Sequence, residues 1–439
     1  MKGLTFKKGI HPDYQKLLTS GKAITPLLPE DELVFPMSQH IGAPCMPVVK
    51  KGDRVLVGQK IGEANGFVSA PIHSSVSGTV KMIEQRMTHR GVRENCVIIE
   101  NDGLYEASPE MEANIISDLK TLDKKALIDK VKNAGIVGLG GATFPTHVKL
   151  STPEDKKVEY IIVNAAECEP YLTSDHRVML ENGEELVAGL RILTQVFSEA
   201  EAVIGIEDNK MDAYEKLVAL TKDETRIRVA LLQTKYPQGS EKHLIYAITQ
   251  REVPSGKLPI EVGCLVHNVD SVVAIYRALT KGQPVMRRIV TVSGHGVKNP
   301  CNLEVKIGTS FKQVLEYAGY DPEKTVKVIA GGPMMGTAIS DIDVPVVKGT
   351  SAILCFTEEE ARKDKMTNCI RCGKCVTVCP MGLVPNTLHR AAMHGHLDTF
   401  LQANGMDCIE CGCCSFTCPA KREIVQSIRT AKAAVRSKK

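Results

Sequence analysis

The sequence predicts a multidomain α/β protein that ends in a small, cysteine-rich helical domain. Three observations lead to this fold class. The chain has 439 residues, which is enough for two to four domains. Its middle part alternates apolar strand patterns with helical patterns, as in an α/β layer with a mostly parallel sheet. Short strand patterns flank this layer, and two closely spaced cysteine motifs follow them near the C-terminal end.

The composition is that of an ordinary globular protein, with 43% hydrophobic and 24% charged residues. The net charge is +4, of which residues 420–439 carry +6, so the rest of the chain is nearly neutral and offers no nucleic-acid footprint. No run approaches the ~18 consecutive apolar residues of a membrane helix. The first residues also lack an apolar signal region. We therefore expect a cytosolic protein, or one that is peripheral to the cytosolic side of a membrane.

Short strands dominate the first part of the chain. Residues 1–30 are rich in Pro, Gly and Lys and are expected to wrap the surface, whereas residues 31–105 alternate strand patterns with turns. The run at 70–80, A-P-I-H-S-S-V-S-G-T-V, resembles the hairpin of a lipoyl- or biotinyl-type barrel-sandwich domain. Those carriers attach their cofactor to a lysine at a turn, but the turn here is Asn65-Gly66. We therefore predict a structural barrel-sandwich module without a swinging arm.

Residues 110–285 are predicted to form a Rossmann-like α/β domain, in which nucleotides bind at the carboxyl ends of the strands. Its expected helices are 125–134, 178–199, 209–221, 240–250 and 270–281, and its expected strands are 160–163, 202–206 and 227–233. Residues 286–350 return to short strands around a helix at 310–318, an order that indicates a β-grasp domain. A charged helix at 357–366 is expected to lead into the C-terminal domain.

The C-terminal domain carries two copies of C-x2-C-x2-C-x3-C-P, the bacterial ferredoxin spacing for a [4Fe-4S] cluster. Three cysteines of a copy can wrap one cluster, while the fourth reaches the other cluster. One cluster would then take Cys369, Cys372, Cys375 and Cys418, and the other Cys408, Cys411, Cys414 and Cys379. Zinc ribbons do not need the third cysteine or the Cys-Pro ending, and disulfides between such close residues are rare.

We therefore predict an α-helical ferredoxin domain over residues 355–430, followed by a basic tail at 431–439. An apolar stripe at Ile424, Ile428 and Val435 indicates that the chain ends in a helix. That helix either packs on the cluster domain or docks on an anionic membrane or an acidic partner.

A glycine-rich turn, Gly138-Leu-Gly-Gly141, precedes a helix start in the α/β domain. It is not the dinucleotide fingerprint, because Thr143 stands where the third glycine would be. Backbone N–H groups at a helix start can cradle a phosphate, to which Lys149 can add a charge. A second polar segment, residues 164–171, follows a strand, and its acidic side chains could contact a ribose or a ring N–H. A plain turn and a solvated loop are the alternatives for these two segments.

The motifs G-L-G-G-A-T-F-P-T-x-V-K and N-A-A-E-x-E-P closely resemble those of the flavin- and NADH-binding subunit of respiratory complex I. The order of domains is similar to that of the C subunit of the Rnf complexes, the ferredoxin–NAD+ oxidoreductases that pump Na+ or H+. The resemblance covers about residues 5–430. It implies FMN, NAD(H) and two [4Fe-4S] clusters as cofactors, and the other subunits of a membrane-bound complex as partners. The chain would interact with ferredoxin indirectly or through a partner subunit. It would lie at the cytoplasmic face of the cell membrane.

The resemblance also implies roles for individual residues. The FMN phosphate and ribityl chain would be lined by Gly138, Gly140, Gly141 and Lys149. Asn164 and Glu167 would contact the flavin, and Glu169 would contact the nicotinamide. Phe144 would contact the adenine, and Glu167 and Glu169 would be the catalytic pair. Further contacts would come from Gly239, Glu241 and Asn268.

Two rival functions stay open. A microcompartment cobalamin reductase shares this domain order. A non-catalytic, electron-carrying scaffold is the other rival, because Ala166 and Ser240 stand where the related motifs have acidic residues.

Overall fold

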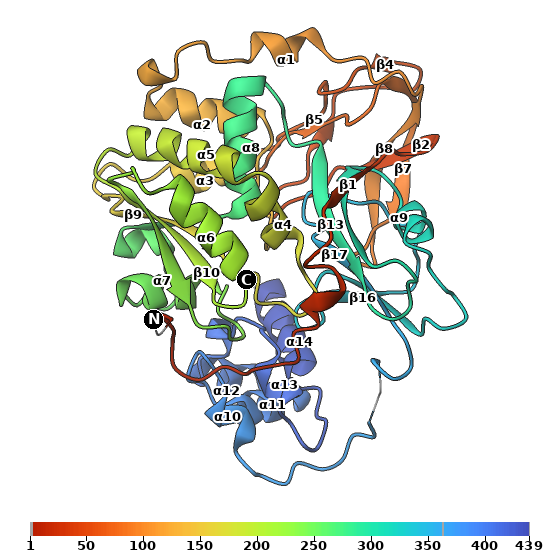
Figure 1. Cartoon of the computed structure of the whole chain (residues 1–439). Coiled ribbons are helices and arrows are strands. Elements are labelled where there is room, and N and C mark those ends of the chain that lie inside the picture. Colours follow the sequence, from red (N-terminus) through yellow and green to blue (C-terminus); the bar gives the residue numbers. More distant parts are fainter. Residues whose placement is uncertain (1–2, 362–363, 439) are drawn as a thin grey trace.

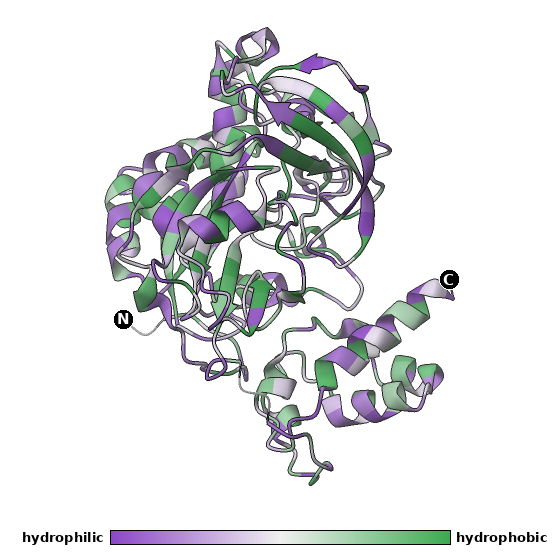
Figure 2. Cartoon of the chain, turned by 90° about the vertical axis from the view of Figure 1, so that its right-hand side faces the viewer, coloured by the Kyte–Doolittle hydropathy of each residue, from purple (hydrophilic) through white to green (hydrophobic). Residues whose placement is uncertain are grey.

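The structure is a computed structural model that describes residues 3–361 and 364–438. Sheets and helices form a large body, and a small helical domain lies below it (Figure 1). Figure 2 shows this C-terminal domain as a separate lobe beside the body. The multidomain α/β class predicted from the sequence is confirmed. None of the helices in the described parts of the chain has the length and apolar character needed to cross a membrane.

Two antiparallel sheets form the barrel-sandwich unit. The larger sheet has the order β2-β8-β7-β4, with bounds Glu32–Pro36, Arg93–Asn101, Gly78–Met87 and Arg54–Val55. The smaller sheet has the order β3-β5-β6, with bounds Met46–Pro47, Lys60–Glu63 and Ile72–His73. Side chains from both sheets, such as Phe35 and Ile61, are fully buried in a hydrophobic core that continues into the α/β layer.

Four parallel strands form the centre of the α/β layer, in the order β11-β10-β9-β12. Their bounds are Ile227–Leu232, Glu201–Glu207, Tyr160–Ala165 and Cys264–Asn268. The helices of this layer are α2 Lys124–Asn133, α3 Thr146–Leu150, α4 Ser174–Glu181, α5 Gly183–Val196, α6 Met211–Leu220, α7 Glu241–Thr249 and α8 Val269–Lys281. Because all strands run the same way, their carboxyl ends meet at one edge.

Two features of this layer differ from the sequence prediction. The single helix predicted at 178–199 is wrong, because the chain breaks at Asn182 between α4 and α5. Asn182 and Gly183 have poor helix propensity, which accounts for the break. Strand β12 was not predicted, since its five residues form an apolar run without alternation.

A six-stranded mixed sheet follows, in the order β1-β14-β13-β17-β15-β16. Its strands are β1 Ile24–Leu27, β14 Cys301–Lys306, β13 Arg287–Ser293, β17 Ala352–Phe356, β15 Lys327–Ala330 and β16 Thr337–Ile339, and helix α9 Phe311–Tyr317 packs on it. Strand β1 comes from the N-terminal segment and pairs in parallel with β14. That segment therefore completes a sheet, in addition to crossing the surface.

The charged helix predicted at 357–366 is wrong for the residues that the structure describes, which form a turn at 358–361 and no helix at 364–366. A tertiary contact of Glu360 competes with the helix, because its carboxylate accepts a hydrogen bond from the backbone N–H of His295, which follows β13. It also accepts one from the hydroxyl of Tyr171. These bonds hold the segment against the six-stranded sheet. Residues 362–363 of the predicted helix lie outside the described residues.

The C-terminal domain contains α10 Lys374–Thr377, α11 Pro385–Met393, α12 Leu397–Gln402, α13 Cys413–Phe416 and α14 Ile424–Ser437. The predicted stripe of α14 is buried against Leu388 and Phe400, so this face is not free for a membrane. Helix α14 also continues past the boundary expected at residue 431. This domain also contains a 3-10 turn at Gly405–Asp407. The remaining elements of the chain are helix α1 Pro109–Ala113 and the 3-10 turns at Lys16–Leu18, Leu119–Thr121 and Pro259–Val262.

Candidate cofactor and electron-transfer site

The predicted site residues of β9 and β12 meet at the carboxyl edge of the parallel sheet. Asn164 and Asn268 are register partners on these neighbouring strands. The amide of Asn164 donates to the carbonyl of Gly239 (2.7 Å), which brings the 236–243 segment to the same edge. The amide of Asn268 donates to the carboxylate of Asp175 (2.6 Å), and its oxygen accepts from the N–H of Asp270 at the start of α8.

The glycine turn lies directly against this edge. Its ends are joined by a hydrogen bond from the N–H of Gly138 to the carbonyl of Phe144 (2.9 Å). A Cβ atom at Gly140 would lie 2.2 Å from the amide nitrogen of Asn268, so only glycine allows this approach. A Cβ atom at Gly141 would meet open space. The turn therefore packs on the strand edge at one glycine and leaves an open backbone surface at the next.

Lys149 lies on α3, with its ammonium group 3.0 Å from the carbonyl of Val266 and 3.4 Å from the carboxylate of Glu241. Its side chain is 24% exposed, so the ammonium group is accessible to an anion at this edge. Glu241 is the first residue of α7. Lys149 and Glu241, which the sequence analysis placed at one site, are thus direct neighbours.

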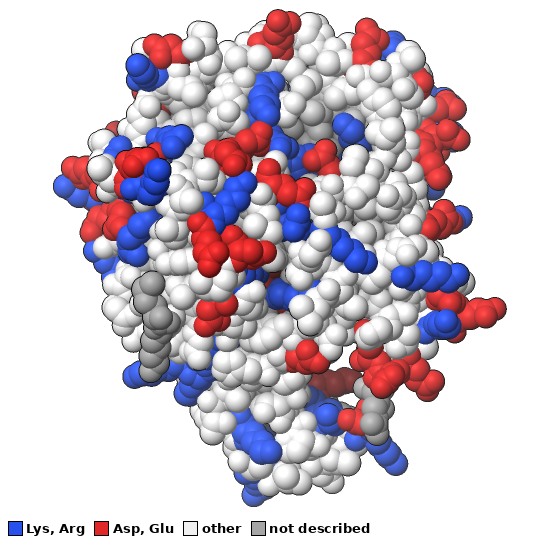
Figure 3. Space-filling view, viewed as in Figure 1, with Lys and Arg blue, Asp and Glu red and all other residues white. Residues whose placement is uncertain are grey.

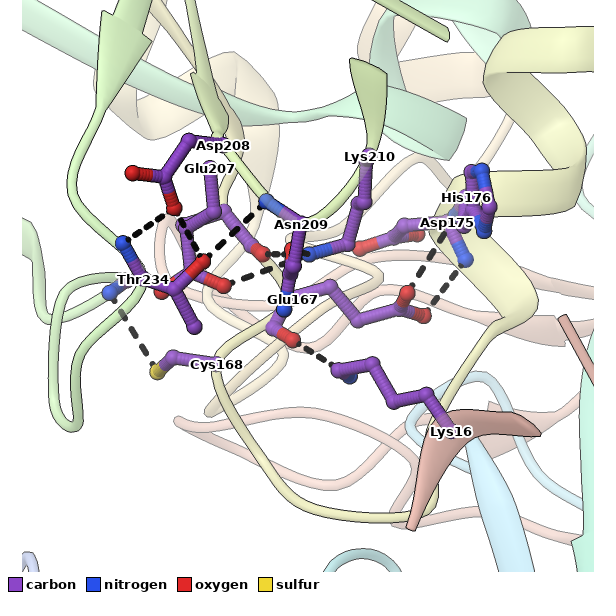
Figure 4. Close-up of polar contacts among 12 residues, drawn as sticks. Lys16, Glu167, Cys168, Asp175, His176, Glu207, Asp208, Asn209, Lys210 and Thr234 are labelled. Carbon is purple, nitrogen blue, oxygen red and sulfur yellow. Dashed lines mark hydrogen bonds and ion pairs between the residues drawn. The ribbon is translucent and has the colours of Figure 1, made fainter. Parts of the chain in front are cut away.

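A loop with strained backbone follows β9. Glu167 and Tyr171 have φ angles of +47° and +67°, a left-handed conformation that costs a non-glycine residue about 1–2 kcal/mol. The buried ammonium group of Lys16 holds this loop by donating to the carbonyls of Glu167 (2.8 Å), Glu169 (3.0 Å) and Leu172 (2.6 Å). Figure 4 shows the contact with Glu167. Burial lowers the pKa of Lys16 to about 8. The N-terminal segment therefore anchors the loop that carries both predicted catalytic glutamates.

A second buried lysine supports the same loop. Lys210 donates to the carbonyl of Ala166 (2.7 Å) and forms an ion pair with Glu207 (3.2 Å). Figure 4 shows Lys210 and Lys16 approaching the loop from different elements. The loop is thus fixed through its main chain by two cationic side chains.

The carboxylate of Glu167 stabilises the start of α4. It accepts hydrogen bonds from the backbone N–H groups of Asp175 (2.7 Å) and His176 (3.3 Å) and from the hydroxyl of Ser174 (3.2 Å). A negative charge at a helix N-terminus is favourable because unpaired N–H groups point toward it. The left-handed backbone of Glu167 lets its side chain reach back to this helix.

The carboxylate of Glu169 joins three parts of the chain. It accepts hydrogen bonds from the N–H groups of Met334 (3.0 Å) and Met335 (2.9 Å), which lie between β15 and β16, and it lies 3.4 Å from the hydroxyl of Tyr236. Desolvation raises the pKa of Glu169 to about 7. The hydroxyl of Tyr236 also donates to the carbonyl of Cys411 (2.7 Å). Glu169 is therefore linked through one phenol group to the second cysteine motif.

Gln238 is a fully buried residue whose side-chain nitrogen and oxygen both lack a hydrogen-bond partner within the described residues. Leaving a buried amide unpaired costs about 1–3 kcal/mol for each group. Gln238 precedes Gly239, whose N–H contacts the sulfur of Cys168 (3.3 Å). A bound group with both donors and acceptors, such as the pyrimidine edge of a flavin, would satisfy this amide. These residues therefore fit FMN.

One of the two predicted cysteine sets lies around a cavity in the C-terminal domain. This cavity is lined by Cys379 together with Cys408, Cys411 and Cys414. Cys375 lies near Cys418 and Cys369 of the other predicted set. Among residues 3–361 and 364–438, no three potential ligands converge on a single metal ion. Thiolates spread around a cavity fit a polynuclear iron–sulfur cluster, whose corners lie apart.

The cysteine-lined cavity lies next to the α/β layer. Tyr236 and Cys168 form one apolar cluster with Cys411 and Cys413. His243 of α7 lies 3.1 Å from the carbonyl of Pro380, which follows Cys379. By contrast, Cys369 and Cys372 are exposed. One cysteine set is therefore buried beside the flavin-type loops, and the other lies toward solvent.

Comparisons with known proteins agree with this architecture. Residues 4–104 match the family described as "RnfC Barrel sandwich hybrid domain". Residues 131–277 match the "Nuo51 FMN-binding domain", and residues 289–338 match the "SLBB domain". The three matched segments coincide with the three sheet-containing units described above.

Full-length relatives decide the family. The chain is 48% identical over 98% of its length to the C subunit of the Na(+)-translocating ferredoxin:NAD(+) oxidoreductase complex of Acetobacterium woodii, covering 96% of that protein. It is 45% identical over 98% of its length to the proton-translocating counterpart of Clostridium ljungdahlii, covering 93% of it. The chain belongs to the RnfC family. It is also 38% identical to the C subunit of the ion-translocating oxidoreductase complex of Rhodobacter capsulatus, over 98% of the chain and 83% of that protein.

For this member of the RnfC family, several residues at the site escaped the sequence analysis. Lys16, Lys210, Tyr236 and Gln238 all contact or adjoin the predicted loops. Tyr236 and Gln238 lie in the segment that supplied Gly239, so that segment was the available signal. Lys16 and Lys210 had no signal, because a buried lysine has no local sequence pattern that distinguishes it from a solvated one.

Proposed function

We propose that this chain is the peripheral electron-transfer subunit of an ion-translocating ferredoxin:NAD+ oxidoreductase complex, located at the cytoplasmic face of the membrane. It passes electrons between NAD(H) and partner subunits, with FMN and two [4Fe-4S] clusters as its cofactors. Ion movement belongs to the complex as a whole. The observation that carries the proposal is the packing of Tyr236 and Cys168 of the flavin-type loops against Cys411 of a cysteine-lined cavity.

When bound, FMN exchanges a hydride with NAD(H) and single electrons with iron–sulfur clusters. The chain supplies the surroundings for this exchange. The open backbone at Gly141 and the unpaired amide of Gln238 offer surfaces for the isoalloxazine and ribityl groups. Lys149 offers a cation for the phosphate at the same edge. The loop at 164–172 is rigidly supported, so it can hold a planar ring system in one orientation.

The two catalytic candidates differ in what their carboxylates touch. The carboxylate of Glu167 is engaged by α4, and that of Glu169 is engaged by the amides of Met334 and Met335. These contacts support positioning roles for both glutamates. A direct contact between Glu169 and the nicotinamide stays a prediction, as does the contact of Phe144 with adenine.

The cysteine sets define an order for electron transfer. The set formed by Cys379, Cys408, Cys411 and Cys414 lies beside Tyr236, so its cluster would be the inner one. The set formed by Cys369, Cys372, Cys375 and Cys418 contains two exposed thiols, so its cluster would be the outer one, accessible to a partner. Electrons would pass between FMN, the inner cluster, the outer cluster and the partner subunit.

The decisive experiment is NADH oxidation by the isolated chain, purified anaerobically and containing about eight iron atoms. We expect NADH-dependent reduction of ferricyanide without any membrane partner, because hydride transfer needs only groups within this chain. Cys369→Ser, which removes a ligand of the outer cluster, serves as the comparison. This variant should keep flavin reduction by NADH while losing the outer-cluster EPR signal. A wild-type chain replete in FMN and iron that does not oxidise NADH would refute the enzymatic function and favour a non-catalytic scaffold.

A further inference from the structure

A second cleft lies between helix α8 and the strands β13 and β14, away from the cysteine motifs. Its cavity volume is about 340 Å³. In Figure 3, acidic and basic side chains are recessed in the region that α8 and β13 occupy in Figure 1. Its apolar walls come from Leu139, Ala274, Pro284, Val285 and Met286. A cleft of this size accommodates a small organic molecule.

The charged residues of this cleft are unevenly paired. Arg277 and Lys281 on α8 share one carboxylate, that of Glu185 (2.5 and 2.6 Å), which balances one of their two positive charges. Arg287 contacts Asp270 at 3.4 Å and Glu304 at 3.3 Å. These long contacts leave one guanidinium nitrogen of Arg287, Nη1, without a hydrogen-bond partner in the described parts of the chain.

Lys306 lies directly across from Arg287 in the β13–β14 pair. Its ammonium group makes no hydrogen bond or ion pair with the described residues and only faces the ring of Tyr105 at 5.8 Å. Desolvation lowers the pKa of Lys306, and the charge of Arg287 lowers it further against the opposing effect of Glu304. Like charges directly opposite each other destabilise a sheet. An anion between the two side chains would remove this repulsion and satisfy the free donors.

We propose that this cleft binds a small organic molecule through a phosphoryl group held between Arg287 and Lys306. The free Nη1 of Arg287 can donate a hydrogen bond to a phosphoryl oxygen, and the ammonium group of Lys306 adds a point charge. The doubly charged phosphoryl group matches two cations better than a single carboxylate does. The apolar walls would cover the organic part of the molecule. Neither Arg287 nor Lys306 takes part in the proposed electron-transfer route, although Leu139 of the glycine turn lines this cleft as well.

The test uses the full-length chain loaded with FMN, so that the flavin phosphate site is already filled. Isothermal titration calorimetry compares phenyl phosphate, inorganic phosphate and phenol as probes. We expect phenyl phosphate to bind more tightly than inorganic phosphate, which cannot use the apolar walls, and phenol not to bind. Lys306→Gln should weaken phenyl phosphate binding about tenfold or more, the usual effect of losing a charge-assisted hydrogen bond.

Lys312→Gln is the matched control, because Lys312 is an exposed lysine on α9 outside the cleft. It should bind phenyl phosphate like the wild type. Arg287→Gln should weaken binding as well, and a thermal melt of each variant shows whether it is folded. The proposal is overturned if the FMN-loaded wild type does not bind phenyl phosphate, if Lys306→Gln binds as tightly as the wild type, or if Lys312→Gln weakens binding equally.

Discussion

Replacing Lys16 by methionine should release FMN, although Lys16 lies in none of the flavin-type motifs. The side chain of methionine is similar in length but cannot donate to the three carbonyls that Lys16 holds. At about 2 kcal/mol for each buried carbonyl left unpaired, the loss is ~6 kcal/mol. Removing the buried charge of Lys16 recovers part of this free energy. The drop of the Lys16 pKa from 10.5 to about 8 corresponds to ~3 kcal/mol. A net loss of ~3 kcal/mol remains, which would loosen the loop at 164–172.

The assay is fluorescence titration of FMN into the flavin-free chain. If cofactor binding requires the ordered loop, a loss of ~3 kcal/mol raises the Kd for FMN about a hundredfold. Lys7→Met is the control, because Lys7 is an exposed residue of the same segment. It should bind FMN like the wild type. If Lys16→Met binds FMN within threefold of the wild type, the reasoning that this lysine organises the cofactor loop is incorrect.

Three further outcomes follow from contacts at the site. Tyr236→Phe should keep its FMN and iron but slow electron transfer from FMN to the inner cluster about tenfold, because the hydrogen bond between the phenol and Cys411 is lost. Rapid-freeze EPR measures this rate, and an unchanged rate would contradict the route. Cys379→Ser should damage the inner cluster beside Cys408 and spare the outer one; loss of the outer EPR signal instead would show that the crossed ligation is wrong. Glu169 has a pKa near 7 in the folded chain against 4.5 in an unfolded one, so its contribution to stability is present below pH 4.5 and is lost as the pH rises through 7. Urea unfolding of wild type and Glu169→Gln at pH 5 and pH 8 should therefore show a fall of up to ~3 kcal/mol in the wild type that is smaller in the variant.

The sequence was sufficient to bring several site residues together. Asn164, Asn268 and Gly239 were predicted to share one site, and the structure places them in contact at the carboxyl edge of the parallel sheet. The resemblance to the flavin-binding family supplied this grouping, and the structure explains it because parallel strands end at a common edge. The separation of the cysteines into two crossed sets was inferred from spacing alone, and the shape of the C-terminal domain supports it.

Contacts between distant segments were not predictable in this way. Two examples are the hydrogen bonds from Lys16 to the loop at 164–172 and from Tyr236 to Cys411. They depend on how whole domains pack, and no local sequence pattern predicts them. The pairing of β1 with β14 is of the same kind. The predicted helix at 357–366 failed for a related reason, because Glu360 bonds to His295 and Tyr171, which are far from it in sequence.

The N-terminal segment links regions that are synthesised at very different times. Leu4 pairs with Leu232, Gly9 donates to the carbonyl of Val378, and β1 pairs with β14. These residues are synthesised before their partners, which emerge only after more than half of the chain has been made. Pairings so far apart in sequence slow folding and expose unpaired segments meanwhile. The nascent chain must therefore keep its first segment unengaged until the cysteine motifs appear, and a fusion partner placed at that end would compete with the last step of assembly.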